Sequence, residues 1–204
     1  DDPYRVIFDA IPADVQYRAP LVTPWPEIAG VHTAVVTGKK GEEIHTDQFG
    51  RIKVKFHWDR SPADDEKTSC WVRCMMPWTG SGWGMMAVPR MGQEVVVQFE
   101  EGNPDRPLVI GMLYNANTMP PWALDANKTQ SGVKTRSTKD GSDKTFNELM
   151  FEDKKGAELV RFQSERDYQQ IVKNDASITV GEGHKDKGDM DLTVHRHLTE
   201  ILKT

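Results

Sequence analysis

The sequence predicts an all-β protein, in which a small barrel is followed by strands that need other copies of the chain to form a core. Short β-branched runs separated by glycine and proline turns fill residues 25–115, which is typical of small barrels and sandwiches. One run, Arg51–Trp58, alternates apolar and polar side chains with the period of a half-buried strand. Beyond residue 165, apolar residues recur at an approximate spacing of eight, which is too sparse for a core within one chain.

Five segments of the first region have the pattern of strands. They are Val31–Thr37, Arg51–Trp58, Cys70–Met75, Glu94–Glu100 and Leu108–Tyr114. In the second, Ile52, Val54 and Phe56 form an apolar face opposite a polar one. Five strands with glycine and proline turns over about 90 residues fit a Greek-key barrel, of which the oligonucleotide/oligosaccharide-binding (OB) fold is the commonest kind. A small sandwich is the alternative.

The composition divides the chain near residues 120–122. All 12 prolines and all six tryptophans lie at or before Trp122, and the remainder is rich in Lys, Asp, Glu, Thr and Gly. We therefore expect the barrel at residues 25–115 and a different kind of structure from residue 116 onward. Residues 1–24, which open with Asp-Asp and contain four prolines, are expected to be the end of an upstream domain and a linker.

The region after residue 115 has a hairpin signal and then a repeat. Asn147–Glu152 and Ala157–Gln163 can pair across Lys154-Lys155-Gly156. The repeat places Val172 eight residues before Val180 and, after an interruption at residues 183–188, Val194 eight residues before Leu202. Several chains around one axis would bury these four residues together. The alternative is a loose, polar β tail.

Composition also limits the function. Hydrophobic residues make up 37% of the chain and charged residues 28%, and the net charge is −5. An acidic chain is a poor candidate for binding phosphate backbones, so we expect no nucleic-acid partner. No apolar run approaches the roughly 20 residues that span a bilayer, and we expect no signal peptide.

Two cysteines, Cys70 and Cys74, are spaced C-x3-C rather than at the usual spacing of a zinc site. There is no second cysteine pair, and His57 is the one further ligand nearby. We expect both cysteines to be small buried apolar residues on one face of a strand.

Two other patterns favour ordinary structural roles. Gly80–Gly84 lacks the Lys-Ser/Thr of a phosphate loop, so we expect a flexible barrel loop whose flanking Trp78 and Trp83 pack on the barrel or on another subunit. Glu100 and Glu101 are not expected to act as a glycosidase-type carboxylate pair, because neighbours on a strand point to opposite faces. Asp64 and Asp65 lie in a polar loop with Pro62 and are expected to be solvated.

His195 and His197 are the candidates for a metal site. On a strand their imidazoles point the same way, and three chains would bring six nitrogens around one axis. Val194 and Leu198 compete for that face, however, so we expect two surface histidines and no metal or other cofactor.

Several strings together carry a family resemblance over about residues 20–180. They are Thr46–Arg60 (TDQFGRIKVKFHWDR), Ser69–Arg73 (SCWVR), Pro89–Val95 (PRMGQEV), Gly102–Pro107 (GNPDRP), Tyr114-Asn115, Asn147–Leu149 (NEL) and Glu152–Gly156 (EDKKG). In these strings the chain closely resembles VgrG, the spike protein of bacterial type VI secretion systems, and the related cell-puncturing spikes of phage baseplates. Cys74 departs from the family pattern, and its role is left open.

The resemblance implies a non-enzymatic homotrimer that punctures target envelopes. It implies the end of a tail-hub domain at 1–24, an OB-fold domain at 25–115, a neck at 116–165 and the start of a trimeric β-prism or β-helix needle at 166–204. Val172, Val180, Val194 and Leu202 would then form the trimer core.

The resemblance also implies partners and a location. The partners are a tube of Hcp rings, a PAAR tip protein and effector proteins, with transient contact to the target membrane. The spike would assemble in the bacterial cytoplasm and then be secreted or delivered. Two alternatives from the residues are an OB-fold module that binds sugar or single-stranded nucleic acid, and a glycosidase.

Overall fold

The computed structural model of the chain describes residues 3–183 and 188–201. It divides into one unit that spans Asp1–Gln163 and a second that spans Ser164–Thr204. No strand or helix occurs in residues 3–30. A backbone hydrogen bond from Ile28 N–H to Gly102 O (2.8 Å) ties the end of this segment to the first unit's barrel.

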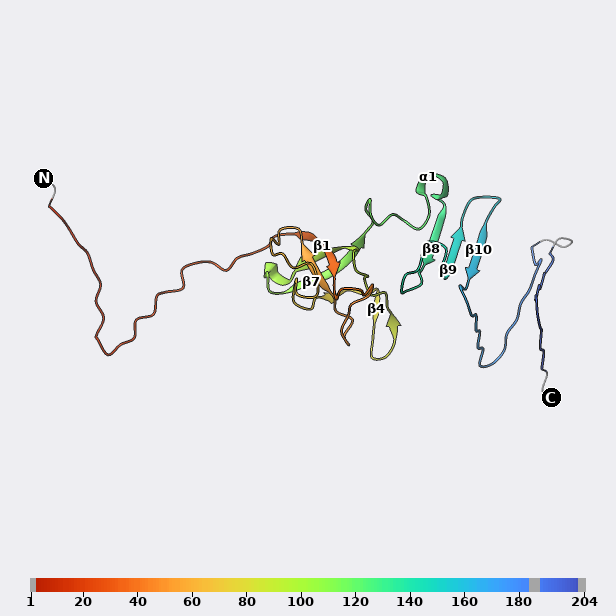
Figure 1. Cartoon of the computed structure of the whole chain (residues 1–204), viewed down its shortest axis with the longest axis horizontal. Coiled ribbons are helices and arrows are strands. Elements are labelled where there is room, and N and C mark those ends of the chain that lie inside the picture. The colour runs from red at the N-terminus through yellow and green to blue at the C-terminus, as the bar shows by residue number, and fades with distance from the viewer. Residues whose placement is uncertain (1–2, 184–187, 202–204) are drawn as a thin grey trace. The chain divides into compact units, whose positions relative to one another are not determined.

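Five strands form the main sheet of the first unit (Figure 1): β1 (Val31–Thr37), β2 (Lys53–Phe56), β3 (Arg73–Cys74), β6 (Glu94–Phe99) and β7 (Pro107–Leu113). Their order is β2-β1-β6-β7-β3. Every pair is antiparallel except β3 with β7, which is parallel. All five strands that the sequence predicts are therefore present, although three are shorter than expected.

A single pair of residues closes this sheet into a barrel. Ile52, just before β2, and Val72, just before β3, exchange both backbone hydrogen bonds at 3.0 and 2.8 Å. The first and last strands in the sheet order are thereby joined, and the OB-type barrel is confirmed over the sandwich.

The interior of the barrel is apolar and fully covered. Ile52 and Val54 are completely buried and Phe56 is 8% exposed, whereas Lys53 and Lys55 lie on the outer face, so the predicted alternation is confirmed. The complete buried core is Ala34, Val36, Ile52, Val54, Phe56, Val72, Val95, Val97, Phe99 and Val109.

The glycine-rich segment forms a hairpin where the sequence predicts a flexible loop. Strands β4 (Trp78–Thr79) and β5 (Gly84–Met85) pair in register, and Trp78 and Trp83 contact each other edge to face at 5.0 Å. Both indoles stay more than half exposed, so within one chain they pack on each other and not on the barrel core.

A second sheet follows the short helix α1 (Leu124–Asn127). It contains β8 (Gln130–Lys134), β9 (Glu148–Glu152) and β10 (Leu159–Gln163) in the antiparallel order β10-β9-β8, and we call it the neck sheet. The predicted hairpin is confirmed, because β9 and β10 pair along their length, with Glu148 opposite Gln163 at one end and Glu152 opposite Leu159 at the other. Gly132 has φ +142°, and a Cβ there would lie 2.1 Å from Leu149 O, so glycine allows β8 to approach β9.

The described part of the second unit, residues 164–183 and 188–201, contains no helix or strand. Nearly all its side chains are exposed, including Ile171, Ile178, Leu192 and Ile201 at 70–77%. In the described part of this unit, these apolar side chains are not buried in a core within a single chain.

Candidate functional site

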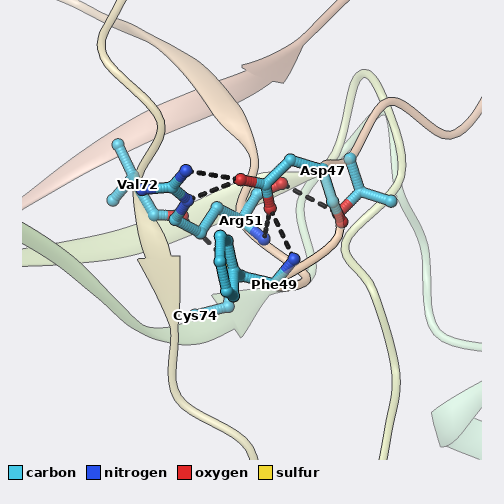
Figure 2. Close-up of polar contacts among 6 residues, drawn as sticks. Asp47, Phe49, Arg51, Val72 and Cys74 are labelled. Atoms are coloured by element: carbon cyan, nitrogen blue, oxygen red, sulfur yellow. Dashed lines mark hydrogen bonds and ion pairs between the residues drawn. The ribbon is translucent and has the colours of Figure 1, made fainter.

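The loop before β2 is organised by one carboxylate (Figure 2). Asp47 Oδ1 accepts the backbone N–H groups of Phe49 and Arg51 at 3.0 Å, and its Oδ2 accepts Nε of Arg51 at 2.6 Å. Burial alone would raise the pKa of Asp47, but the hydrogen bonds from the Arg51 side chain and from the two backbone N–H groups hold it below its ordinary value. The Asp-Gln-Phe-Gly-Arg string is therefore a structural turn. It leads directly to Ile52, whose pairing with Val72 closes the barrel and forms its seam.

The lysines on the outer face of β2 are bound within the chain. Lys53 Nζ donates to Ser69 O at 2.6 Å and lies 5.0 Å from the ring centre of Trp71. Lys55 Nζ donates to Ser61 O at 2.6 Å and to Ala63 O. Both ammonium groups hold loops of the barrel, which makes this face a poor platform for a bound sugar or nucleic acid.

The covered face of the neck sheet contains a buried carboxylate. Glu148 on β9 has a side chain with no exposed surface. One carboxylate oxygen of Glu148 accepts a hydrogen bond from Nε–H of Arg161 at 2.7 Å, and the other accepts a hydrogen bond from Nε1–H of Trp122 at 3.2 Å. The linker that contains Trp122 is thereby attached to the sheet by a charge-assisted network.

A second carboxylate connects a barrel loop with the loop between β8 and β9. Glu43 Oε1 accepts the backbone N–H of Asp140 at 2.9 Å. This bond, a hydrogen bond from the Thr138 side chain and the nearby charges of Arg136 and Arg90 lower the pKa of Glu43. The contact joins the predicted OB-fold and neck segments within the first unit.

The cysteines differ from the prediction. Cys70 is exposed, so the expectation that it is buried is wrong, and only Cys74 packs partly against the core. The reason is that β3 is confined to Arg73–Cys74, so the strand pattern does not extend back to residue 70. Burial raises the pKa of the Cys74 thiol to about 11, which keeps it protonated and unreactive.

The carboxylate pairs lie in turns. Glu100 and Glu101 are in a 3-10 turn after β6 rather than on a strand, and Glu100 pairs with Arg73 at 2.6 Å. Asp64 and Asp65 lie in a loop, where Asp65 accepts the backbone N–H of Lys67. Neither pair is arranged for joint acid and base chemistry.

The predicted trimer-core residues are not brought together in one chain. Val172, Val180 and Val194 are 46–48% exposed in backbone without strand pairing, and Leu202 lies outside the described residues. His195 and His197 are exposed, and Nε2 of His197 lies 2.8 Å from Oγ1 of Thr199. Within residues 3–183 and 188–201, no three His, Cys, Asp or Glu side chains are grouped to hold a metal ion.

One surface was missed by the sequence analysis. The face of the neck sheet opposite Glu148 presents Val133, Leu149, Phe151 and Val160, which are 38–64% exposed. The alternation of Glu148, Leu149, Met150, Phe151 and Glu152 indicates a strand with one polar and one apolar face, but it does not show which face the rest of the chain covers.

Among the described residues, no helix has the length and apolar character of a membrane span.

Comparison with protein families matches both regions. The family model for the type VI secretion system/phage-baseplate injector OB domain matches residues 32–114, which contain the barrel. The model for the C-terminal trimerisation domain of bacteriophage T4 gp5 matches residues 131–203, which contain the neck sheet and the repeat.

Curated relatives match most of the chain. It is 52% identical over 173 residues to the type VI secretion system spike protein VgrG1a of Pseudomonas aeruginosa, with 85% of this chain covered. It is 45% identical over 188 residues to VgrG5 of the same organism, with 92% covered. The matched regions are 27% and 24% of those relatives, so the chain spans about a quarter of their length.

Proposed function

Because the chain belongs to the VgrG family of type VI secretion spike proteins, we propose that it is a structural part of a contractile injection machine, a trimeric needle that punctures target envelopes and carries effectors. The observation that carries this proposal is the order of the two family matches along one chain. An injector-type barrel comes first, and a segment that matches a trimerisation domain comes second; within that segment, residues 164–183 and 188–201 form no helix or strand.

The division of the chain follows from the same order. We assign residues 1–24 to the end of the tail-hub domain and its linker, 25–115 to the OB-fold domain, 116–165 to the neck and 166–204 to the start of the needle. The ends of the barrel strands and the division of the chain after Gln163 support these boundaries.

In the needle, the sparse apolar residues are assigned to the axis. Each level would bury three copies of Val172, Val180, Val194 or Leu202, and burying one valine contributes about 1.5–3 kcal/mol. The half-exposed state of the three described valines in one chain supports this assignment, because the trimer would remove the remaining exposed surface. Closed three-chain pairing would also remove the free strand edges.

The machine's other parts are assigned by family membership. We propose that the trimer contacts an Hcp ring, a PAAR tip protein and effectors, that it touches the target membrane transiently, and that it assembles in the bacterial cytoplasm before delivery. Its role is mechanical rather than catalytic. Stiffness along one axis, which comes from interleaved chains, is the property that puncture requires.

The experiment is a mass measurement by light scattering after size exclusion on the full chain. We expect a mass near three times 23.1 kDa. Val180→Asp would place three carboxylates together near the axis, where like charges repel strongly, and should shift the protein toward monomer. A wild-type monomer at all concentrations, or a Val180→Asp trimer as stable as wild type, would contradict the axial assignment.

A further inference from the structure

The barrel and the neck sheet are connected in two ways, and the first is the chain segment between them. This segment, residues 114–129, is anchored to both parts. Asn115 Nδ2 donates to Glu94 Oε2 on β6 at 2.7 Å, and Trp122 Nε1 donates to Glu148 on β9 at 3.2 Å. A single connecting segment, even an anchored one, still allows the two parts to turn about it as about a hinge.

The second connection begins at Glu43, in the loop between β1 and β2. Its backbone carbonyl accepts the N–H of Met91 at 2.9 Å, and its side chain is 24% exposed. A terminal guanidinium nitrogen of Arg90 lies 4.0 Å from Glu43 Oε2, and among the described residues neither of these two atoms has a hydrogen-bond partner. The barrel therefore fixes the backbone of Glu43 and places its carboxylate beside a cation.

The connection ends on the loop between β8 and β9, residues 135–147, which we call the β8–β9 arm. Ser137 N–H donates to Thr145 O at 2.9 Å, so the pairing of the two strands continues into the arm. Further along the arm, the N–H of Asp140 donates to Glu43 Oε1 at 2.9 Å, across 97 positions of sequence. Because the arm is paired and continuous with the sheet, a contact on the arm also restrains the neck sheet.

We propose that Glu43 is a positioning residue that holds the neck sheet in one orientation relative to the barrel, so that the two move as one body. This inference rests on the proposed mechanical function, because a push on the barrel is passed on to the needle only if the joint between them resists bending. Arg90 of the barrel and Arg136 of the arm both contribute positive charge near the Glu43 carboxylate, and the Thr138 side chain donates a further hydrogen bond to it. The joint is thus held by charge-assisted contacts from both parts.

The test measures how far the neck moves relative to the barrel in the full chain. Spin labels are attached to Cys70, which is exposed on the barrel, and to Lys155→Cys, in the exposed turn between β9 and β10. Labelled chain is mixed with excess unlabelled chain before assembly, so that the recorded distances lie within one chain. The variants are Glu43→Ala and Glu43→Gln, whose amide oxygen can still accept the Asp140 N–H. Glu42→Ala is the matched control, because it removes the same charge from the neighbouring exposed residue.

We expect Glu43→Ala to broaden the distance distribution and to accelerate hydrogen exchange of the Asp140 amide at least about tenfold, which is the loss of one hydrogen bond to a charged group. Glu43→Gln should lie between Glu43→Ala and wild type, and Glu42→Ala should match wild type. Exchange in β1 and β9 should stay unchanged, because the barrel and the sheet remain folded. If Glu43→Ala loses that protection, Glu43→Gln decides in the same way.

An unchanged distance distribution in the Glu43 variants overturns the inference, and so does equal broadening by Glu42→Ala. Light scattering on the same samples tests the proposed function separately. A wild-type monomer contradicts the trimeric needle, but both labels lie in one chain, so the distances still decide the role of Glu43. A trimer whose distance distribution does not respond to Glu43 overturns the inference alone.

Discussion

Replacing Arg161 by alanine removes both donors that face one oxygen of a buried carboxylate. Arg161 reaches Glu148 Oε2 through Nε at 2.7 Å and through a terminal guanidinium nitrogen at 2.5 Å. The Glu148 side chain has no exposed surface, and after the substitution only the Trp122 Nε1–H bond at 3.2 Å remains. The variant therefore leaves a buried charge with one neutral partner.

The size of the destabilisation depends on how much of the Glu148–Arg161 ion pair is exposed to water. Breaking a fully buried ion pair costs about 3–5 kcal/mol. The Arg161 side chain is 47% exposed, so water already screens part of the attraction and can reach part of the space that the arginine leaves. We therefore expect Arg161→Ala to destabilise the neck sheet by about 2 kcal/mol, and Glu148→Gln in the same chain to restore about 1 kcal/mol by removing the unpaired charge.

The assay is hydrogen exchange of the amides in β9, followed by mass spectrometry of the peptide that contains Glu148. A loss of about 2 kcal/mol accelerates exchange about 30-fold when exchange follows the opening equilibrium. Arg166→Ala is the control, because the Arg166 side chain is 89% exposed and its ion pair is with Asp167, which is also exposed. If Arg161→Ala exchanges within about twofold of the control, the ion pair does not stabilise the sheet and the reasoning is refuted.

Three further outcomes are expected. Ile52→Ala should lower the free energy of unfolding in urea by about 2–5 kcal/mol, because Ile52 is completely buried at the seam; a change below about 1 kcal/mol would contradict this. Hydrogen bonds from Arg51 and from backbone N–H groups hold the folded-state pKa of Asp47 below its ordinary value, so the stabilisation that the carboxylate provides is present above the ordinary pKa and is lost as the pH falls through the folded pKa. The Tm difference between wild type and Asp47→Asn should therefore narrow in acid, and a constant difference would argue against this reasoning. Near pH 8, iodoacetamide should alkylate Cys70 much faster than Cys74, whose pKa is about 11; equal rates would show that Cys74 is accessible as thiolate.

The barrel was predictable because its strands are buried on one side only. In Ile52, Val54 and Phe56, burial imposes a period of two that a single sequence displays directly. The glycine-rich hairpin was not predictable in the same way. Gly84 is needed because a Cβ there would lie 2.5 Å from Trp78 O. Glycine occurs both in flexible loops and where two backbones approach closely, so a glycine-rich segment does not distinguish a loop from a hairpin.

The polarity of the neck sheet needed contacts between distant parts of the chain. The sequence predicts the pairing of β9 with β10, since turn and strand signals are local. Which side is covered depends on Trp122 and Arg161 meeting Glu148, and no local pattern encodes that contact. Exposure of Cys70 was missed for a related reason, because β3 pairs with β7 at Arg73 and Cys74, and the local sequence does not show where that distant pairing begins.

The pairing order of the barrel has a consequence for synthesis on the ribosome. Strand β1 can pair with β2 early, but its other edge waits for β6, because Val31 pairs with Gln98. The seam residue Ile52 emerges long before β7, to which β3 must bind. The barrel therefore keeps unpaired strand edges until about residue 113 has left the exit tunnel, and its hydrophobic interior is completed late, as in chains dominated by non-local contacts.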